Sequence, residues 1–347
     1  MKNPLIGPLL AAWACLALPG IGVAQEATVT VGMAPGIVTG AILMAEAHGY
    51  FKDVGIKVDL NNLDSSADAI ALLAANRFQV VEGGVSAGYF NAFGKDLPIA
   101  MVASRVSTPG RHILMLRPDL KDVIKTPKDL KGRIIATNGP GSVSDYEIGK
   151  ILEAYGLSLA DVDLKIFPFP QYVIAFNNKA IDAGLLIPTW TSDLEKKGFA
   201  IPLAYADEII KPSPETVAVT SINTDWAKKN PEVAKNFFVA YMRGVRDYCQ
   251  AYHHGSTRKE MIDLMVRYGI NRSPAFFEEN PWPAREANGR INGASVMDMQ
   301  NWFAKNKFTN KVFPAGQVID NSYVDYASAK LGPFTLENKD SPLAGCR

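Results

Sequence analysis

The chain is poor in the residues on which metal centres and thiol enzymes depend. Its 347 residues include only 3 cysteines and 4 histidines. His253 and His254 are the only adjacent histidines, and no acidic or cysteine residues at metal-ligand spacing accompany them. Nothing around Cys249 or Cys346 indicates an activated nucleophile. We therefore expect no metal, no organic cofactor and no catalytic residue.

The chain also lacks an excess of charge of either sign. Lysine and arginine number 36, aspartate and glutamate 35, and the formal net charge is +1. Lys2 is the only charged residue before Glu26, so removal of the first 24 residues would leave a neutral chain. A neutral surface of mixed charge argues against a nucleic-acid partner or an acidic membrane surface.

Long apolar runs are absent after the N-terminal segment, and repeats and low-complexity stretches are absent throughout. Residues 1–24 read as a signal peptide, with an apolar run at 9–18 and a small-x-Ala pattern that places cleavage after Ala24. Cys15 as a lipoprotein cysteine is the alternative, and the bulky Trp13 just before it argues against that site. The remaining length and the apolar fraction of 48% suit two folded domains.

Cysteine usage agrees with export. After cleavage only Cys249 and Cys346 remain, and an even pair in an oxidising compartment can form one disulfide that holds the tail. Two unpaired thiols are the alternative, because pairing is not readable from sequence. The tail, residues 334–347, is polar, and we expect it to be loosely held.

Residues 29–60 carry the clearest local pattern. Val29, Val31 and Met33 alternate as in a strand, and a Pro-Gly loop ends that strand. An Ala-rich apolar stretch then predicts a helix that stops at Gly49, before a second strand begins after a turn. A strand, helix and strand of this length form a βαβ unit, so the sheet is expected to be parallel here.

The same stretch carries a family resemblance. Gly49-Tyr50-Phe51, followed by Gly55, resembles the start of type II periplasmic binding proteins. It is most similar to the branch that serves ABC importers of nitrate, alkanesulfonates, taurine and thiamin-type pyrimidines, and the match extends over about residues 27–333. The resemblance implies an α/β fold of two lobes, each a mostly parallel sheet flanked by helices.

Two later stretches continue the family pattern. Residues 126–137 read as a capped turn with Pro127 at its first position, a stop at Gly132 and a buried strand. Residues 138–145, NGPGSVSD, place glycines and hydroxyls directly before a helix, where free amides favour an anion. The sequence there matches neither a Walker loop nor a dinucleotide fingerprint.

The resemblance also implies the lobe boundaries. Lobe 1 is expected to comprise residues 27–109 and 220–333, and lobe 2 residues 110–219. Two crossings between the lobes would permit closure by hinge motion. In open α/β sheets ligands bind at the carboxyl ends of the strands, which here means between the lobes.

The candidate ligand-binding residues lie at the predicted strand ends, helix starts and crossings. They are Ala34, Pro35, Thr39, Ser65, Gly84, Ser86, Arg105, Gly141, Ser142, Ser144, Trp190 and Glu215. For each serine a plain helix cap is the alternative role, and for Arg105 it is surface solvation or an ion pair at the hinge. Trp190 either stacks on a ligand or packs between the lobes, and both readings stay open.

The function that follows from the resemblance and the export signal is that of a periplasmic, monomeric solute-binding protein. It would capture a small organic anion, of the sulfonate or aromatic carboxylate type, and deliver it to the permease subunits of an ABC importer. A pyrimidine, thiamin precursor or other heteroaromatic solute is the alternative ligand. An enzyme related to thiamin-pyrimidine synthase is the alternative of another class, but its cysteine-rich iron motif is missing here. A sensor input domain is a third reading, and no membrane span follows the predicted domain.

Overall fold

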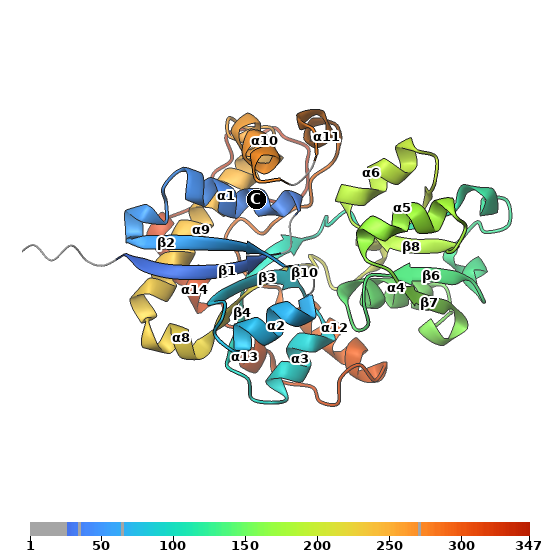
Figure 1. Ribbon diagram of the computed structural model, residues 1–347, viewed down its shortest axis with the longest axis horizontal. Coiled ribbons are helices and arrows are strands. Elements are labelled where there is room, and N and C mark those ends of the chain that lie inside the picture. The colour runs from blue at the N-terminus through green and yellow to red at the C-terminus, as the bar shows by residue number, and fades with distance from the viewer. Residues whose placement is uncertain (1–25, 34–35, 64–65, 270–271) are drawn as a thin grey trace, which may run out of the picture.

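The computed structural model describes residues 26–33, 36–63, 66–269 and 272–347. The expected signal peptide and three of the expected site residues lie outside these ranges. Two sheets, each of five strands, are flanked by helices and lie side by side along the long axis (Figure 1). The two-lobed α/β fold expected from the sequence is confirmed.

The first sheet is built around the predicted βαβ unit. Val29, Val31 and Met33 are fully buried, and their strand pairs in parallel with the strands on both sides of it. The strand order is β2 (Ile56–Asn62), β1 (Ala27–Met33), β3 (Val80–Gly84), β10 (Thr216–Asn223) and β4 (Ile99–Ser107). The parallel register expected at this point is therefore correct.

The second sheet takes its strands from the middle of the chain. The strand order is β7 (Asp163–Ile166), β6 (Ile134–Thr137), β8 (Ala183–Leu186), β5 (Ile113–Leu116) and β9 (Ile201–Tyr205). β6 pairs in parallel with β7 and β8, while β5 is antiparallel to β8 and β9.

Both sheets are mixed, and in each of them four of the five strands run in the same direction while one is reversed. β10 runs antiparallel to β3 and β4, as β5 does to its neighbours. Each of these strands is the first to follow a crossing from the other lobe, so it enters its sheet at the edge where the parallel strands end. β10 begins at Thr216, before the expected boundary at residue 220.

Helices cover both faces of the first sheet (Figure 1). They are α1 (Gly40–Ala47), α2 (Ser66–Ala74), α3 (Ala87–Phe93), α8 (Thr224–Lys229), α9 (Pro231–Tyr252), α10 (Arg258–Arg267), α11 (Pro274–Glu279), α12 (Gly293–Lys305), α13 (Ala315–Val318) and α14 (Ser322–Leu331). The long helix α9 lies against α1 so closely that a Cβ at Gly244 would stand 2.1 Å from the Ala41 carbonyl oxygen. Only glycine permits this approach.

Four helices flank the second sheet. They are α4 (Val143–Ala154), α5 (Phe169–Asn177), α6 (Pro188–Lys196) and α7 (Ala206–Ile209). Tyr172 and Phe176 of α5, together with Leu194 of α6, fill a separate hydrophobic cluster on one face of this sheet. Each sheet thus has apolar packing of its own, which suits two bodies joined by crossings.

The C-terminal tail is not loosely held, contrary to the expectation from its polarity. Cys249 of α9 and Cys346 form a disulfide, and both are buried. The Tyr252 hydroxyl donates to the Ala344 carbonyl at 2.7 Å, and Ser341 is buried beside His253. The expectation is wrong because a covalent link and buried partners from α9 outweigh the tail's composition.

Candidate functional site

The first lobe places a buried ion pair at the base of the loop that follows β1. Arg105 of β4 is 5% exposed, and its Nε lies 3.2 Å from Glu82 Oε2. Its Nη2 donates to Thr39 Oγ1 at 3.3 Å, next to the helical turn η1 (Ile37–Thr39). The Arg105 charge is therefore compensated by a partner within lobe 1, and the ion pair does not cross the hinge as the alternative role had it.

A second buried arginine in this network was missed by sequence reasoning. Arg285 is 1% exposed, donates to the Val38 carbonyl at 2.8 Å, and hydrogen-bonds the Tyr241 hydroxyl. Tyr241 in turn donates to Glu82. These bonds hold the turn η1 in place. No motif around Arg285 marks it, because its partners lie far away in the sequence.

Gly84 and Ser86 lie where the first lobe meets the second. A Cβ on Gly84 would stand 3.5 Å from Val143 Cγ1 of α4. Ser86 precedes α3, and its hydroxyl makes no capping bond. The Ala87 amide, at the start of α3, donates to the Gly141 carbonyl at 2.8 Å, so this amide is used by the chain itself.

The start of α4 is likewise occupied by its own side chains. Ser142 caps the helix by accepting from the Asp145 amide at 3.3 Å, which is the alternative role foreseen for it. Asp145 Oδ2 accepts from the Gly141 amide at 2.8 Å, and Ser144 is buried. Gly141 has φ +66°, a conformation that favours glycine. A carboxylate of the chain thus takes a position that an anionic ligand was expected to use.

Four polar side chains lie behind this helix start, those of Thr137, Asn138, Asp145 and Tyr172. The Thr137 hydroxyl hydrogen-bonds the Asp145 carboxylate, whereas Asn138 Oδ1 and Tyr172 Oη have no hydrogen-bond partner among the described residues. Thr137, Asp145 and Tyr172 are each at most 2% exposed. Burial raises the pKa of Asp145, and the nearby Thr137 hydroxyl and Gly141 amide only partly oppose it. The sequence analysis named the helix start but not these residues.

Trp190, in the first turn of α6, lies at the rim between the lobes. The Arg272 guanidinium stands 4.8 Å from its ring centroid and pairs with Asp193 of the same helix. Trp190 also packs against the second-sheet cluster that contains Tyr172. The packing role of Trp190 is therefore present, and its contact with a ligand stays a prediction.

Glu215 lies at the second crossing between the lobes, directly before β10, and apart from the four polar side chains described above. It is 1% exposed, and neither carboxylate oxygen has a hydrogen-bond partner among the described residues. Burial and the negative charges of Glu147, Asp207 and Asp298 raise its pKa well above the ordinary value. Glu147 itself pairs with His112 at 2.8 Å. Ala34, Pro35 and Ser65 lie outside the described residues.

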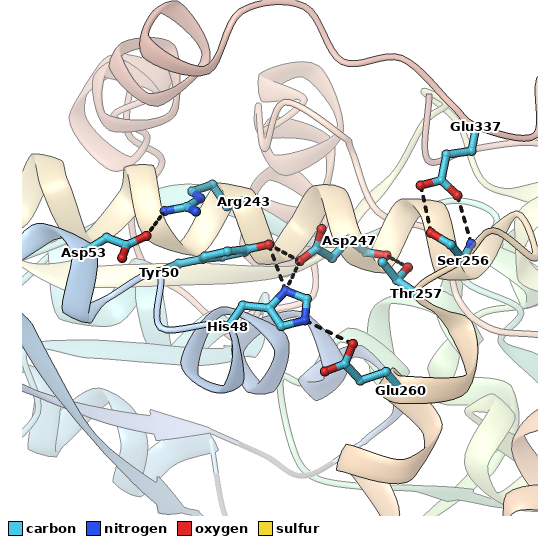
Figure 2. Close-up of polar contacts among 9 residues, drawn as sticks. All are labelled: His48, Tyr50, Asp53, Arg243, Asp247, Ser256, Thr257, Glu260 and Glu337. Atoms are coloured by element: carbon cyan, nitrogen blue, oxygen red, sulfur yellow. Dashed lines mark hydrogen bonds and ion pairs between the residues drawn. The ribbon is translucent and has the colours of Figure 1, made fainter.

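His48, on the surface of the first lobe, contacts two acidic residues. His48 contacts Asp247 at 3.2 Å and Glu260 at 3.1 Å, and Tyr50 is stacked under Arg243 (Figure 2). This network ties the end of α1 to α9 and α10. In the part of the chain that the structure describes, no group of three or more histidine, cysteine or acidic residues is arranged to hold a metal ion.

Comparison with known proteins gives one family. The family described as NMT1/THI5 like matches residues 38–251. No curated protein sequence matches the chain significantly. No helix among the described residues combines the length and apolar character of a membrane span.

Solved structures share the fold at low sequence identity. The periplasmic aliphatic sulphonate binding protein SsuA from Escherichia coli is 16% identical with a TM-score of 0.69, covering 84% of this chain and 92% of that chain. The periplasmic nitrate-binding protein NrtA from Synechocystis PCC 6803 is 14% identical with a TM-score of 0.70, covering 93% and 92%. The desulfurization enzyme DSZB is 14% identical with a TM-score of 0.62, covering 88% and 100%. The fold is therefore shared by binding proteins and by at least one enzyme.

Proposed function

The chain belongs to the NMT1/THI5-like family, and from this we propose that it is a solute-binding protein of an ABC importer. It captures a small organic solute between two lobes and delivers it to the membrane subunits of the transporter. The observation that carries the proposal is the family match together with a fold shared with periplasmic sulphonate- and nitrate-binding proteins. The low identity to those proteins leaves the solute to be argued from this chain's own residues.

We propose lobe boundaries close to the expected ones, with residues 27–109 and 216–333 in lobe 1, because all of β10 pairs in the first sheet, and residues 110–215 in lobe 2. The chain passes between the two sheets after β4 and again before β10. Two such connections allow rigid-body closure over a ligand held at the strand ends. Contacts such as the Ala87 amide to the Gly141 carbonyl belong to the closed arrangement in this proposal.

Two solute classes compete. An organic anion, such as a sulfonate or aromatic carboxylate, is supported by the fold neighbours and by the helix start at Gly141. A pyrimidine or other heteroaromatic solute is supported by Trp190, and by the engagement of Arg105 with Glu82, which leaves less positive charge for an anion. Both classes have a flat or apolar body that Trp190 can cover.

The location and the oligomeric state in this proposal follow from the expected signal peptide and the family resemblance. We place the mature chain in the periplasm, as a monomer that meets its solute and its permease there. An enzymatic role is the rival class, since the fold also serves the desulfurization enzyme DSZB. No catalytic residue is proposed, because no nucleophile stands beside an oriented base at the described strand ends.

A thermal-shift screen of residues 25–347 tests this function. The solutes are alkanesulfonates, aromatic carboxylates, pyrimidines and inorganic anions, each at millimolar concentration. A solute that binds only the folded state must raise the melting temperature. A shift without turnover supports the binding protein. Chemical conversion of the solute supports the enzyme, and no shift with any class contradicts the proposal.

A further inference from the structure

The turn η1 is held from the interior of lobe 1 by two arginines. Arg285 donates to the Val38 carbonyl at 2.8 Å, and Arg105 donates to the Thr39 hydroxyl at 3.3 Å. The Thr39 hydroxyl accepts in turn from the Gly36 amide at 3.1 Å. Both guanidinium groups thus act on a short turn between β1 and α1.

This turn follows β1 at the edge of the first sheet that faces lobe 2. β1 and β3 are parallel, and a Cβ on Gly84, at the end of β3, would stand 3.5 Å from Val143 of α4 in lobe 2. Ligands of open α/β sheets bind outside this edge, where the parallel strands end. A shift of η1 would therefore change the surface that lobe 1 presents to a solute.

Arg285 lies between α11 and α12, directly after a residue that is bonded to the end of β4. The Ala284 amide donates to the Pro109 carbonyl at 2.9 Å, and the Ala284 carbonyl accepts from the Ser107 amide at 3.0 Å. The Arg285 carbonyl accepts from the Cys346 amide at 3.0 Å. The backbone here is thus bonded to β4 at one residue and to the C-terminal tail at the next.

The tail is fitted closely to the same stretch. A Cβ at Gly345, whose φ is +84°, would stand 2.5 Å from Ala284 Cβ and 3.2 Å from Pro109 Cδ, which favours glycine at this position. The next residue, Cys346, is joined to Cys249 of α9 by the disulfide. The end of the tail is therefore fixed both to α9 and to the stretch that carries Arg285.

The Arg285 side chain is confined by its surroundings. It is 1% exposed, and its Nη2 donates to the Tyr241 hydroxyl. Its Cζ lies 5.6 Å from the ring centroids of both Tyr241 and Tyr248. Because a guanidinium presents its donors in a rigid plane, a displacement of the Arg285 backbone would also displace the donor that holds Val38.

We propose that Arg285 is a positioning residue of the solute site, and that the disulfide-held tail sets its place. The path runs from Cys249 through Cys346 and Arg285 to Val38, along the disulfide and a hydrogen bond at each end of Arg285. This inference rests on the proposed function, because η1 lies at the edge where the solute is proposed to bind. Loss of the Arg285 contacts should free η1 without unfolding lobe 1.

Hydrogen exchange of the mature chain, followed by mass spectrometry, tests the inference. The amides to follow are those of Thr39 and Gly40, which donate within the turn. In Arg285→Met they should exchange about 10-fold faster, as expected when a buried hydrogen bond that holds the turn is lost. Arg117→Met is the control, because this arginine of lobe 2 also donates to a backbone carbonyl, that of Lys179 at 3.0 Å, and it should leave η1 unchanged.

Two further variants extend the test. Arg285→Lys keeps the buried positive charge, so it serves if Arg285→Met fails to fold. A single ammonium does not reproduce the planar fork to Val38 and Tyr241, and exchange at η1 should rise several-fold. Cys346→Ser releases the tail and should also raise the exchange of η1, by a smaller factor than Arg285→Met.

Unchanged exchange of η1 in the Arg285 variants would overturn the inference. So would a rise shared equally by the amides of β6 in lobe 2, because it would indicate a general loss of stability. Unchanged exchange of η1 in Cys346→Ser would overturn the part assigned to the tail.

Calorimetry with ethanesulfonate, benzoate and pyrimidine gives a second readout. Each of these probes that binds the wild-type chain should bind Arg285→Met about 5- to 10-fold more weakly, and Arg117→Met equally well. Equal affinity for wild type and Arg285→Met would overturn the role in the solute site. Binding of none of the three counts against the proposed function, whereas the exchange of η1 still decides the positioning by Arg285, so the two failures are distinguishable.

Discussion

Trp190 packs against the lobe-2 cluster, and the Arg272 guanidinium lies over its ring, 4.8 Å from the centroid. These contacts hold the indole in place. Under the proposed hinge closure Arg272, which belongs to the opposite lobe, would separate from the indole when the lobes open, and the ring could then serve as a wall of the cleft. Trp190 thus has a packing role and a proposed binding role. The effect of substituting it on solute affinity tests the binding role.

Trp190→Ala should weaken binding of an aromatic solute by about 1–3 kcal/mol, because the stacked surface is lost. Titration calorimetry with the best aromatic hit measures the change. Trp190→Phe is the matched control, since it keeps a ring and should retain most of the affinity. An unchanged dissociation constant for Trp190→Ala would assign the residue to packing alone.

At the scale of elements, the two lobes meet along α4 and α12. A Cβ at Gly149 of α4 would stand 2.0 Å from Trp302 Cζ2 of α12, so the indole fills a hole that only glycine leaves. Tyr146 lies edge-on to Trp302 at 5.7 Å and donates to Asp298 at 2.7 Å. Lys150 pairs with the same aspartate. A second contact between the lobes, the ion pair between Lys196 of α6 and Glu279 of α11, is exposed, unlike the packing of Trp302 on Gly149.

Gly149→Ala should force α4 and α12 apart and lower the free energy of unfolding by about 1–3 kcal/mol, as overpacking does. Urea unfolding measures the loss, and small-angle scattering shows whether the lobes separate. Trp302→Phe in the same chain should restore part of the stability by vacating the space. Gly316→Ala, where a Cβ meets nothing within 4 Å, is the control and should be close to neutral.

The C-terminal tail is joined to α9 by a single covalent link. The disulfide joins Cys249 and Cys346 across 97 residues of sequence, and the Cys346 amide donates to the Arg285 carbonyl. In the chain-entropy picture a loop of about 100 residues corresponds to roughly 4.7 kcal/mol, and removal of a native disulfide typically costs about 2–5 kcal/mol. Cys346→Ser should lower the unfolding free energy by that order.

The measurement is chemical denaturation with and without reductant. Wild-type protein in reductant should unfold at the midpoint of Cys346→Ser in oxidising buffer, and the variant itself should not respond to reductant. Identical midpoints for oxidised wild type and variant would contradict a stabilising disulfide.

At the scale of the whole molecule, buried acids between the lobes couple stability to pH. Burial raises the pKa of Glu215, and Glu147, Asp207 and Asp298 raise it further. Burial lowers the pKa of His112, but the charge and hydrogen bond of the Glu147 carboxylate and the charge of Asp207 together outweigh it, so the net shift of this pKa is upward. Both groups therefore hold their protons more tightly when folded than when unfolded. The stability they contribute is complete below their unfolded pKa values, and it is lost as the pH rises through the folded ones.

Glu215→Gln separates this effect from that of other carboxylates. The melting temperature of wild type relative to the variant should fall between pH 5 and pH 8, because ionised Glu215 is buried beside other negative charges. Differential scanning calorimetry across that range provides the comparison. A difference between the two proteins that stays constant with pH would contradict the shift.

Local patterns in the sequence were enough for many of the elements, although β9 and α7 were not predicted. The alternation at Val29, Val31 and Met33 and the stop at Gly49 identified the βαβ unit, because periodicity and helix ends depend on neighbouring residues. The family resemblance supplied the two lobes. It did not supply the direction of β5 and β10, since strand direction within a sheet depends on where the chain enters from the other lobe.

The site depended on tertiary structure. The sequence named Arg105 and the helix start at Gly141, but only the fold pairs Arg105 with Glu82 and brings Asp145 near Tyr172. It also chose the disulfide over two free thiols. The sequence by itself determined the βαβ unit and the resemblance to the family. Which buried polar atoms find partners was decided by packing among residues far apart in the chain, because those contacts exist only in the folded structure.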